Sequence, residues 1–306
     1  MTAGSRVESF ALRPAPFRSG VSLLADLSLS QFSDQLVNGV TLGMLYILVA
    51  LGLNIILGLM GVINFSHGAF FMLGAYLMYQ FVPTVGFWPA IVIAALLVGL
   101  LGMLFESTLI RPLYKRIPEY TLLLTFGTAL IFAQIVRWKW GDDAVRVEIP
   151  DALASSVTVA GLQFPIYKDV FLVGVTILIL ALVWFLINKT NIGIIIRAGT
   201  RDAEMVKILG INMPAMFTLV FGIGSLMAGL AGALAAPIYA IQPDLASQWI
   251  VLTFVIVIVG GLLIGILTSF MSLIWPPAVE LTGYVLMGVI LLIRPRGLFG
   301  VEGLFE

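Results

Sequence analysis

Charge is missing from most of this sequence, and its absence restricts the possible fold more than any other feature. No Asp, Glu, Lys or Arg occurs between Asp34 and Glu106, within 208–243 or within 245–279. Charged residues make up 10% of the 306 residues, against roughly 25% in soluble domains. Because a helix needs only about 20 apolar residues to cross a bilayer, each charge-free stretch can hold at least one membrane span.

Continuous apolar runs of this length indicate helices rather than barrel strands. Within lipid every backbone amide and carbonyl must be bonded inside the chain, and barrel strands would alternate apolar and polar residues. The sequence therefore predicts an all-α fold, a polytopic transmembrane helical bundle of about 8 spans. The predicted spans are 35–58, 61–82, 87–105, 120–137, 170–188, 215–236, 248–269 and 273–293.

The positions of the basic residues predict how the bundle is oriented. Lys and Arg concentrate in loops on the cytoplasmic side. The loops 106–119 and 189–214 each carry several of them, so both are expected to face the cytoplasm, and the acidic segment 138–169 is expected outside. The N-terminus is then external. A single span at 248–269, however, leaves Arg294 outside, against the charge rule.

Composition excludes several classes of function. Residues 1–34 are polar and lack an apolar segment followed by a small-residue cleavage site, so we expect an N-terminal extension rather than a signal peptide. The absence of cysteine excludes a disulfide framework and a thiolate metal site. His67 is the only histidine, and no metal site is predicted. Zero net charge means that no overall field attracts nucleic acid.

Uncharged polar residues cluster in the first two predicted spans. At membrane depth such side chains must find partners, so they face the bundle interior or a watery cavity rather than lipid. They line a path for a solute in one interpretation, and only form hydrogen bonds between helices in the other. The candidates for a translocation path are Asn38, Thr41, Asn54, Asn64, Ser66 and His67.

The loop 189–214 contains a pattern typical of a short amphipathic helix. Thr200 or Asp202 can cap its start, and Gly210 can end it. A structured helix in a cytoplasmic loop offers a docking surface to another protein, whereas the simpler interpretation is a basic loop that only sets topology. The residues predicted for docking are Arg197, Arg201, Asp202, Glu204, Leu209 and Gly210.

No catalytic site is predicted. The sequence lacks a Gly-x-x-x-x-Gly-Lys-Ser/Thr phosphate loop and the familiar hydrolase motifs, so no ATPase site can be located in it. Apart from Arg137 at the very end of 120–137, Glu280 is the one charge inside a predicted span, and it could serve a proton-coupled carrier. Pro276 and Pro277 suit a helix start, which would place Glu280 in a first turn, where an acid is favourable. A stand-alone channel or carrier is thus the alternative to transport driven by a partner's ATPase.

Several motifs of the chain resemble those of the permease subunits of branched-chain amino acid ABC importers. The matching segments are Asn38 to Gly43, Gly61 to Gly68, Leu73 to Tyr76, Arg111 to Tyr114, Arg197 to Ile211 and Arg294 to Gly300. The resemblance implies that residues 35–300 are a permease domain of the inner membrane. It also implies that the loop 189–214 is a coupling helix that docks on two ATP-binding subunits, and that those subunits, not this chain, use ATP.

The same resemblance implies further partners and a substrate class. The partners are a second, related permease subunit and a periplasmic or extracellular substrate-binding protein. The implied substrates are the branched-chain amino acids. Urea or short-chain amides are the alternative, because their importers are built on the same type of permease.

The chain departs from the resembled family in two charged positions. Ala69 stands where the family usually has an acid after the His-Gly pair, which removes a charge at the membrane edge. Ser107 follows Glu106 where the family often has an Arg. Any role of the acid at the first position is therefore in doubt for this chain.

A third departure concerns the Gly-Gly pair at 260–261. Relatives carry a further Gly-rich turn and small-residue stretch before the next Leu-Leu-Ile-Gly, and this chain does not. Restoring that stretch would divide 248–273 into two passes and return Arg294 to the cytoplasm. We therefore expect 245–275 either to misfold locally or to pack as one long helix or two very short ones.

Overall fold

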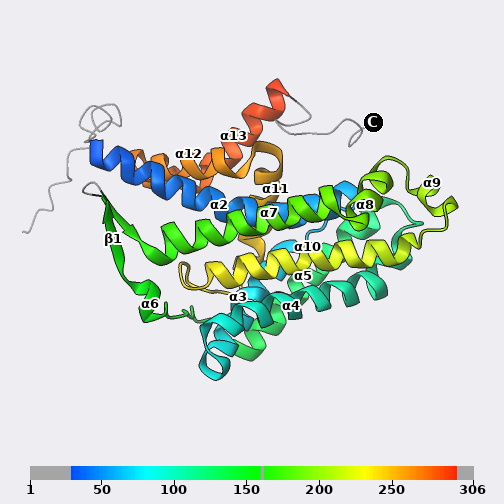
Figure 1. Ribbon diagram of the computed structural model, residues 1–306, viewed down its shortest axis with the longest axis horizontal. Helices are drawn as coiled ribbons and strands as arrows, with labels where there is room; N and C mark the ends of the chain where they lie inside the picture. The colour runs from blue at the N-terminus through cyan, green and yellow to red at the C-terminus, as the bar shows by residue number, and fades with distance from the viewer. Residues whose placement is uncertain (1–28, 160–161, 295–306) are drawn as a thin grey trace, which may run out of the picture.

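The computed structural model describes residues 29–159 and 162–294, and these form a bundle of helices (Figure 1). The all-α prediction is confirmed, with one small antiparallel hairpin outside the bundle. Residues 1–28, which are most of the predicted extension, lie outside the described residues. The elements are α2 (Leu29–Met60), α3 (His67–Val85), α4 (Phe87–Phe105), η1 (Glu106–Ile110), η2 (Arg111–Leu113), α5 (Pro118–Trp140), α6 (Asp151–Ala154), β1 (Ser156–Val159), β2 (Leu162–Pro165), η3 (Ile166–Leu172), α7 (Val173–Lys189), α8 (Asn191–Arg201), α9 (Ala203–Ile208), α10 (Met213–Ala235), α11 (Leu245–Val259), α12 (Gly261–Ile274), η4 (Pro276–Ala278) and α13 (Val279–Ile293).

Seven helical segments among the described residues are long and apolar enough to cross a membrane. They coincide with seven of the predicted spans, although several boundaries differ. α2 begins at Leu29 rather than 35, α3 at His67 rather than 61, and the fifth span at Ile166 rather than 170. α2, α7 and α10 run along the long axis of the molecule (Figure 1).

Small residues let α10 pack closely against its neighbours. A Cβ added at Gly232 would overlap the carbonyl oxygen of Phe71, and one added at Gly74 would overlap that of Gly229. Neither position can hold a larger side chain unless the backbones of α3 and α10 move apart. Lipid provides no hydrophobic driving force between helices, so close van der Waals packing of the backbones is what stabilises their association.

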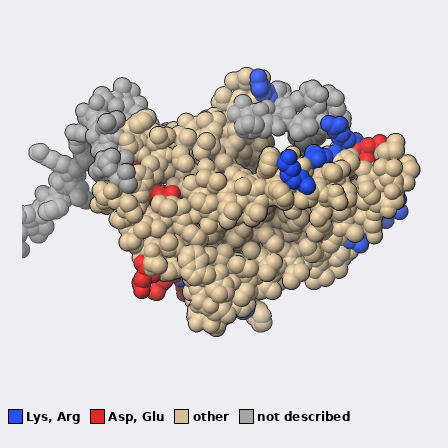
Figure 2. All heavy atoms as spheres, viewed as in Figure 1, with Lys and Arg blue, Asp and Glu red and all other residues tan. Residues whose placement is uncertain are grey.

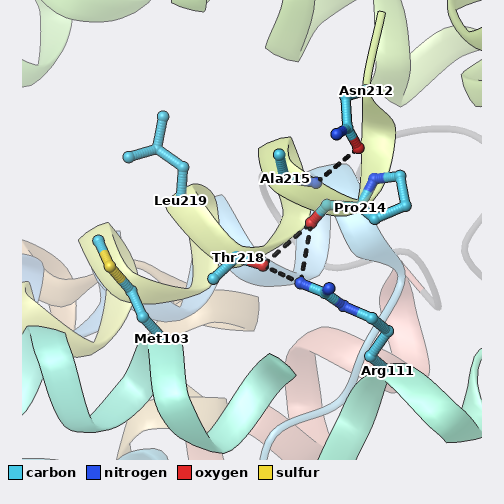
Figure 3. Close-up of a pocket in the computed structure, with 7 residues that line it drawn as sticks. All are labelled: Met103, Arg111, Asn212, Pro214, Ala215, Thr218 and Leu219. Atoms are coloured by element: carbon cyan, nitrogen blue, oxygen red, sulfur yellow. Dashed lines mark hydrogen bonds between the residues drawn. The ribbon is translucent and has the colours of Figure 1, made fainter. Parts of the chain in front are cut away.

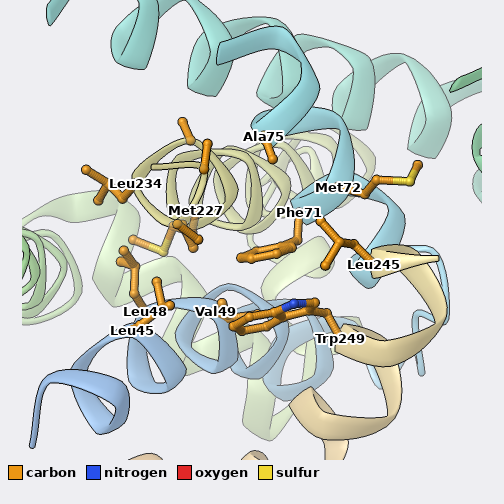
Figure 4. Close-up of a cluster of buried hydrophobic side chains, with 14 of the residues drawn as sticks. Leu45, Leu48, Val49, Phe71, Met72, Ala75, Met227, Leu234, Leu245 and Trp249 are labelled. Atoms are coloured by element: carbon orange, nitrogen blue, oxygen red, sulfur yellow. The ribbon is translucent and has the colours of Figure 1, made fainter. Parts of the chain in front are cut away.

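The largest buried cluster joins α2, α3, α10 and α11 (Figure 4). The rings of Phe71 and Trp249 stack with centroids 4.0 Å apart and planes 23° apart, and Val49 of α2 and Met227 of α10 belong to the same cluster (Figure 4). Trp249 also meets the ring of Tyr46 edge-on, at 5.8 Å. The contacts place α11 beside the middle of α2, and Figure 1 shows it lying across the long axis.

The expected single span at 248–269 is instead two short helices. α11 and α12 meet at Gly260 with a bend of 115°. Gly260 has φ of +103°, a conformation that favours glycine because it has no Cβ. Of the alternatives expected from the shortened Gly-Gly segment, the structure contains the two short helices.

α12 runs antiparallel to α2 and returns to the end where α2 begins. A Cβ at Gly261 would lie 2.8 Å from the backbone nitrogen of Ile47. Farther along α12, Ser269 Oγ donates to the carbonyl oxygen of Gln35 at 2.8 Å. We call this end of the bundle, which also carries β1 and β2, the hairpin end; the opposite end, with α8 and α9, is the α9 end (Figure 1).

The chain enters and leaves the α11–α12 pair at the hairpin end. Ahead of α11, Ile241 forms a β-bridge with Val145, just beyond the end of α5. After α12, α13 crosses back, with Gly283 facing Val255 of α11. The pair is therefore re-entrant, and α13 runs towards the α9 end. This arrangement removes the conflict between span count and the basic charge of Arg294.

Charges separate towards the two ends of the molecule. On the face shown in Figure 2, most Lys and Arg lie at the α9 end, whereas the hairpin end shows mainly Asp and Glu. Lys and Arg favour the cytoplasmic side of a membrane. The arrangement agrees with the predicted orientation, in which the α9 end is cytoplasmic.

Candidate translocation path and coupling surface

The connection from α2 to α3 turns back into the bundle before α3 begins. Nε2 of His67, the first residue of α3, lies 3.0 Å from the carbonyl oxygen of Val49, near the middle of α2. Residues 61–66 are thus a non-helical segment at the depth of the helices. Such backbone is tolerated in a membrane only where protein or a watery cavity surrounds it.

Three of the predicted path residues meet in this connection and are completely buried: Asn64, Ser66 and His67. Asn64 Oδ1 accepts hydrogen bonds from Ser66 N at 3.0 Å and from Ser66 Oγ at 2.5 Å. Asn64 Nδ2 and His67 Nδ1 have no partner among the described residues. These three residues therefore form a buried polar cluster with unused hydrogen-bonding capacity, which we call the α3 cluster.

Two helix interruptions lie at the same level of α2. The start of α3 meets Val49, and the break between α11 and α12 meets Ile47. The start of α11 packs on the start of α3, because a Cβ added at Gly68 would overlap the carbonyl oxygen of Ala246. Interrupted helices that meet near the bilayer midplane build substrate sites in many transporters.

Asn38 and Thr41 lie nearer the hairpin end and face η3. Asn38 Oδ1 accepts from Lys168 Nζ, and Thr41 Oγ1 donates to Asp169 Oδ1 at 2.9 Å. The interpretation that Glu280 stands almost alone as a charge within the spans is wrong. The third span reaches Glu106, the fourth contains Arg137, and the fifth begins early enough to contain both Lys168 and Asp169. Sequence reasoning missed these two because it placed the span's start by hydropathy.

Asn54 lies apart from the other predicted path residues. It is exposed on α2, and a Cβ added at Gly58, one turn farther on, would have no neighbouring atom within 4 Å. No hydrogen bond between Asn54 and the α3 cluster is present among the described residues. The structure therefore brings three of the six candidates together and leaves Asn38, Thr41 and Asn54 elsewhere on α2.

The predicted docking loop folds into two helices rather than one. Asp202 separates α8 from α9 and caps α9, its Oδ1 accepting from Met205 N at 2.8 Å. Thr200, the other predicted cap, instead donates to the carbonyl oxygen of Arg197. Gly210, with φ of +84°, follows the last turn as expected.

α9 presents an apolar surface at the tip of the molecule. Val206 is buried and anchors α9 to a cluster that includes Leu59 and Val220. Met205, Ile208 and Leu209 are exposed, Leu209 to 73%. The charged docking candidates Arg197, Arg201, Asp202 and Glu204 are exposed as well. The loop thus combines apolar and charged groups on a structured support, as a docking surface requires.

A buried carboxylate joins α4 to the start of α10, and sequence reasoning assigned it no role. Glu106 is fully buried; its oxygens accept from Tyr114 Oη at 2.6 Å, from Thr218 Oγ1 and from Arg111 Nη2 at 3.1 Å. Burial, with the hydrogen bond to Glu106, raises the pKa of the Tyr114 phenol, so that it remains a donor. The sequence places Glu106 and Arg111 near each other, so their pairing could have been predicted. Thr218 is far from both in the sequence, so its hydrogen bond to Glu106 could not.

Comparison with known proteins identifies the family. The family described as branched-chain amino acid transport system / permease component matches residues 35–293. The chain belongs to this family. It is therefore a multi-pass membrane permease, the permease component of an ABC transporter, and not a member of an enzyme family.

Individual relatives agree on the permease class but differ in substrate. The high-affinity branched-chain amino acid transport system permease protein LivH of Escherichia coli is 27% identical, covering 88% of this chain and 96% of the relative. BraD of Pseudomonas aeruginosa, a permease protein of the same description, is 25% identical over the same shares. The fructose import permease protein FrcC of Rhizobium meliloti is 28% identical over 65% of this chain and 56% of its own length. No solved structure matches the chain.

Proposed function

We propose that this permease carries branched-chain amino acids across the inner membrane as part of an ATP-driven importer. In this proposal two ATP-binding subunits dock on α8 and α9, a second related permease shares the membrane path, and a substrate-binding protein delivers solute at the hairpin end. The observation that carries it is the junction of two interrupted helices beside the α3 cluster, in a chain with a structured loop at the opposite end.

Charge near the hairpin end favours a zwitterionic substrate over a neutral one. Lys168 and Asp169 are neighbours of opposite charge, and each binds a neutral side chain of α2 instead of an ion-pair partner. An amino acid carries an ammonium and a carboxylate that such groups can attract, whereas urea, amides and sugars carry neither. The names of the LivH and BraD relatives point to the same substrate class.

Reconstituted transport tests the function directly. The chain is placed in proteoliposomes with its ATP-binding subunits, second permease and substrate-binding protein, and uptake of labelled leucine, urea and fructose is compared with and without ATP. We expect leucine uptake that requires ATP. Preferential uptake of urea or fructose would move the substrate assignment to that class, and uptake that persists without the ATPase would support a stand-alone channel or carrier.

A further inference from the structure

A cleft opens between the end of α4 and the start of α10, at the α9 end (Figure 3). It has a volume of about 460 Å³ and is lined by Met103, Arg111, Asn212, Pro214, Ala215, Thr218 and Leu219. None of the lining residues is acidic. Its one cationic side chain is that of Arg111, whose ion-pair partner Glu106 is buried behind it and does not line the cleft.

The guanidinium of Arg111 is held in place from behind. Its Nη2 donates to Glu106 Oε2, to Thr218 Oγ1 and to the carbonyl oxygen of Pro214, the last two drawn in Figure 3. The Arg111 side chain nevertheless remains 38% exposed, whereas that of Glu106 is fully buried. These contacts fix the guanidinium at the wall of the cleft, and its Nε is buried without a partner among the described residues. A preorganised guanidinium favours phosphate and carboxylate ligands.

The start of α10 adds further donors on the opposite wall. Asn212 caps the helix, its Oδ1 accepting from Ala215 N at 3.2 Å, so its side-chain amide nitrogen stays free to donate. Ala215 is exposed in the first turn, where the helix dipole is positive. Lys115 and Arg116 follow Arg111 in the same connection, and both are exposed.

The far wall of the cleft is apolar and continues onto the lipid-facing surface. Met103 and Leu219 line it, and Leu100 and Leu104 of α4 are exposed by 61% and 59%. A ligand that fills this site must therefore join an anionic head to an apolar tail. Basic clefts between helices at the cytoplasmic membrane edge suit lipid head groups for the same reason.

We propose that this cleft binds the phosphate of an anionic phospholipid, with the head group on Arg111 and Asn212 and the acyl chains along Met103, Leu219 and the exposed face of α4. Because α10 follows directly on the docking loop, a lipid seated here also braces that loop. The inference concerns lipid binding and is independent of which solute is transported.

The Ala215→Glu variant tests the proposal against an Ala215→Gln control of the same shape. An acid is favourable in the first turn of a helix, so neither substitution should prevent folding. Native mass spectrometry of the detergent-solubilised protein, titrated with phosphatidylglycerol, measures retained lipid. We expect the wild-type chain and Ala215→Gln to bind alike and Ala215→Glu to bind about tenfold more weakly. Equal binding by all three would overturn the proposal.

Two further measurements distinguish an anionic phospholipid from a neutral one and from free phosphate. Phosphatidylcholine has the same phosphate but no net charge, and we expect its retention to be weak in all variants. Inorganic phosphate should not displace the lipid; if it protects the protein from thermal unfolding as well as phosphatidylglycerol does, the site belongs to a free anion. Asn212→Asp keeps the helix cap and places a carboxylate in the cleft, so unchanged lipid binding by it also contradicts the proposal.

Discussion

Asn64 and His67 are completely buried, yet each keeps a side-chain nitrogen without a partner among the described residues. An unsatisfied buried polar group costs about 1–3 kcal/mol. Retaining two such groups at one helix start is reasonable where a passing solute supplies the missing partners. The unpartnered nitrogens therefore favour the α3 cluster, rather than the whole polar stripe of α2, as the proposed contact site for a solute.

The Asn64→Leu variant should therefore impair transport more than assembly. We expect leucine uptake to fall about tenfold or more, because one lost hydrogen bond in a transport transition state is worth roughly 1.4 kcal/mol or more. Uptake is compared with the amount of assembled complex in the membrane, with Asn54→Leu on the exposed side of α2 as the control. An assembly defect that accounts for the whole loss would favour the packing interpretation.

Gly232 is required because α3 lies too close for any side chain at this position, and not because of its backbone conformation. The Gly232→Ala variant should lower stability by about 1–3 kcal/mol, because the added methyl overlaps the Phe71 carbonyl and must push α3 away from α10. Gly127→Ala in α5, where nothing lies within 4 Å, is the matched control and should be neutral. Thermal unfolding in detergent measures both, and equal behaviour would contradict this packing.

At the scale of elements, α9 is the most informative part of the chain. It is short, capped by Asp202, anchored by Val206 and followed by Gly210. So few residues do not make a stable helix alone, so its position depends on the cluster beneath it. In the proposed importer, this helix would transmit movement from the ATP-binding subunits to α10.

The Gly210→Ala variant should abolish coupled uptake while substrate capture by the binding protein continues. A Cβ at φ of +84° costs about 1 kcal/mol or more, which would shift α9 on its support. Gly141→Ala places a Cβ at the same φ of +84°, but at the hairpin end, and should retain uptake. Replacing the exposed Glu204 should give the same loss; normal uptake in both loop variants would remove the coupling assignment.

For the whole molecule, the re-entrant α11–α12 pair decides the topology. Two helices joined at 115° replace one span, and both connections lie at the hairpin end. The membrane is then crossed by the remaining described helices, so the start of α2 and Arg294 fall on opposite sides. With the α9 end cytoplasmic, the basic residue at 294 obeys the positive-inside rule.

Labelling of single cysteines tests this topology cleanly, because the natural chain has none. Trp275→Cys, just after α12 and exposed, should react with an impermeant maleimide from outside. Arg294→Cys and Lys115→Cys should react only after the membrane is permeabilised. External labelling at 294 together with internal labelling at 115 would require α11 and α12 to span the membrane as one unit.

Hydropathy and charge were enough to predict the helical class and the approximate spans, because the requirements that lipid imposes act on consecutive residues. A span must be long and apolar, and basic loops must stay on one side. These rules act on consecutive residues, so they can be read without the fold. The sequence also identified Asn64, Ser66 and His67 as polar groups that need partners.

Only the tertiary structure decided which of those groups meet and where the helices break. The proximity of His67 to Val49, the return of α12 along α2 and the pairing of Glu106 with Thr218 all join remote segments. Hydropathy reports that a segment is apolar but not whether it crosses the bilayer or turns back within it. That choice depends on contacts such as those of Gly261 and Gly265 with α2, which form only when the whole bundle packs.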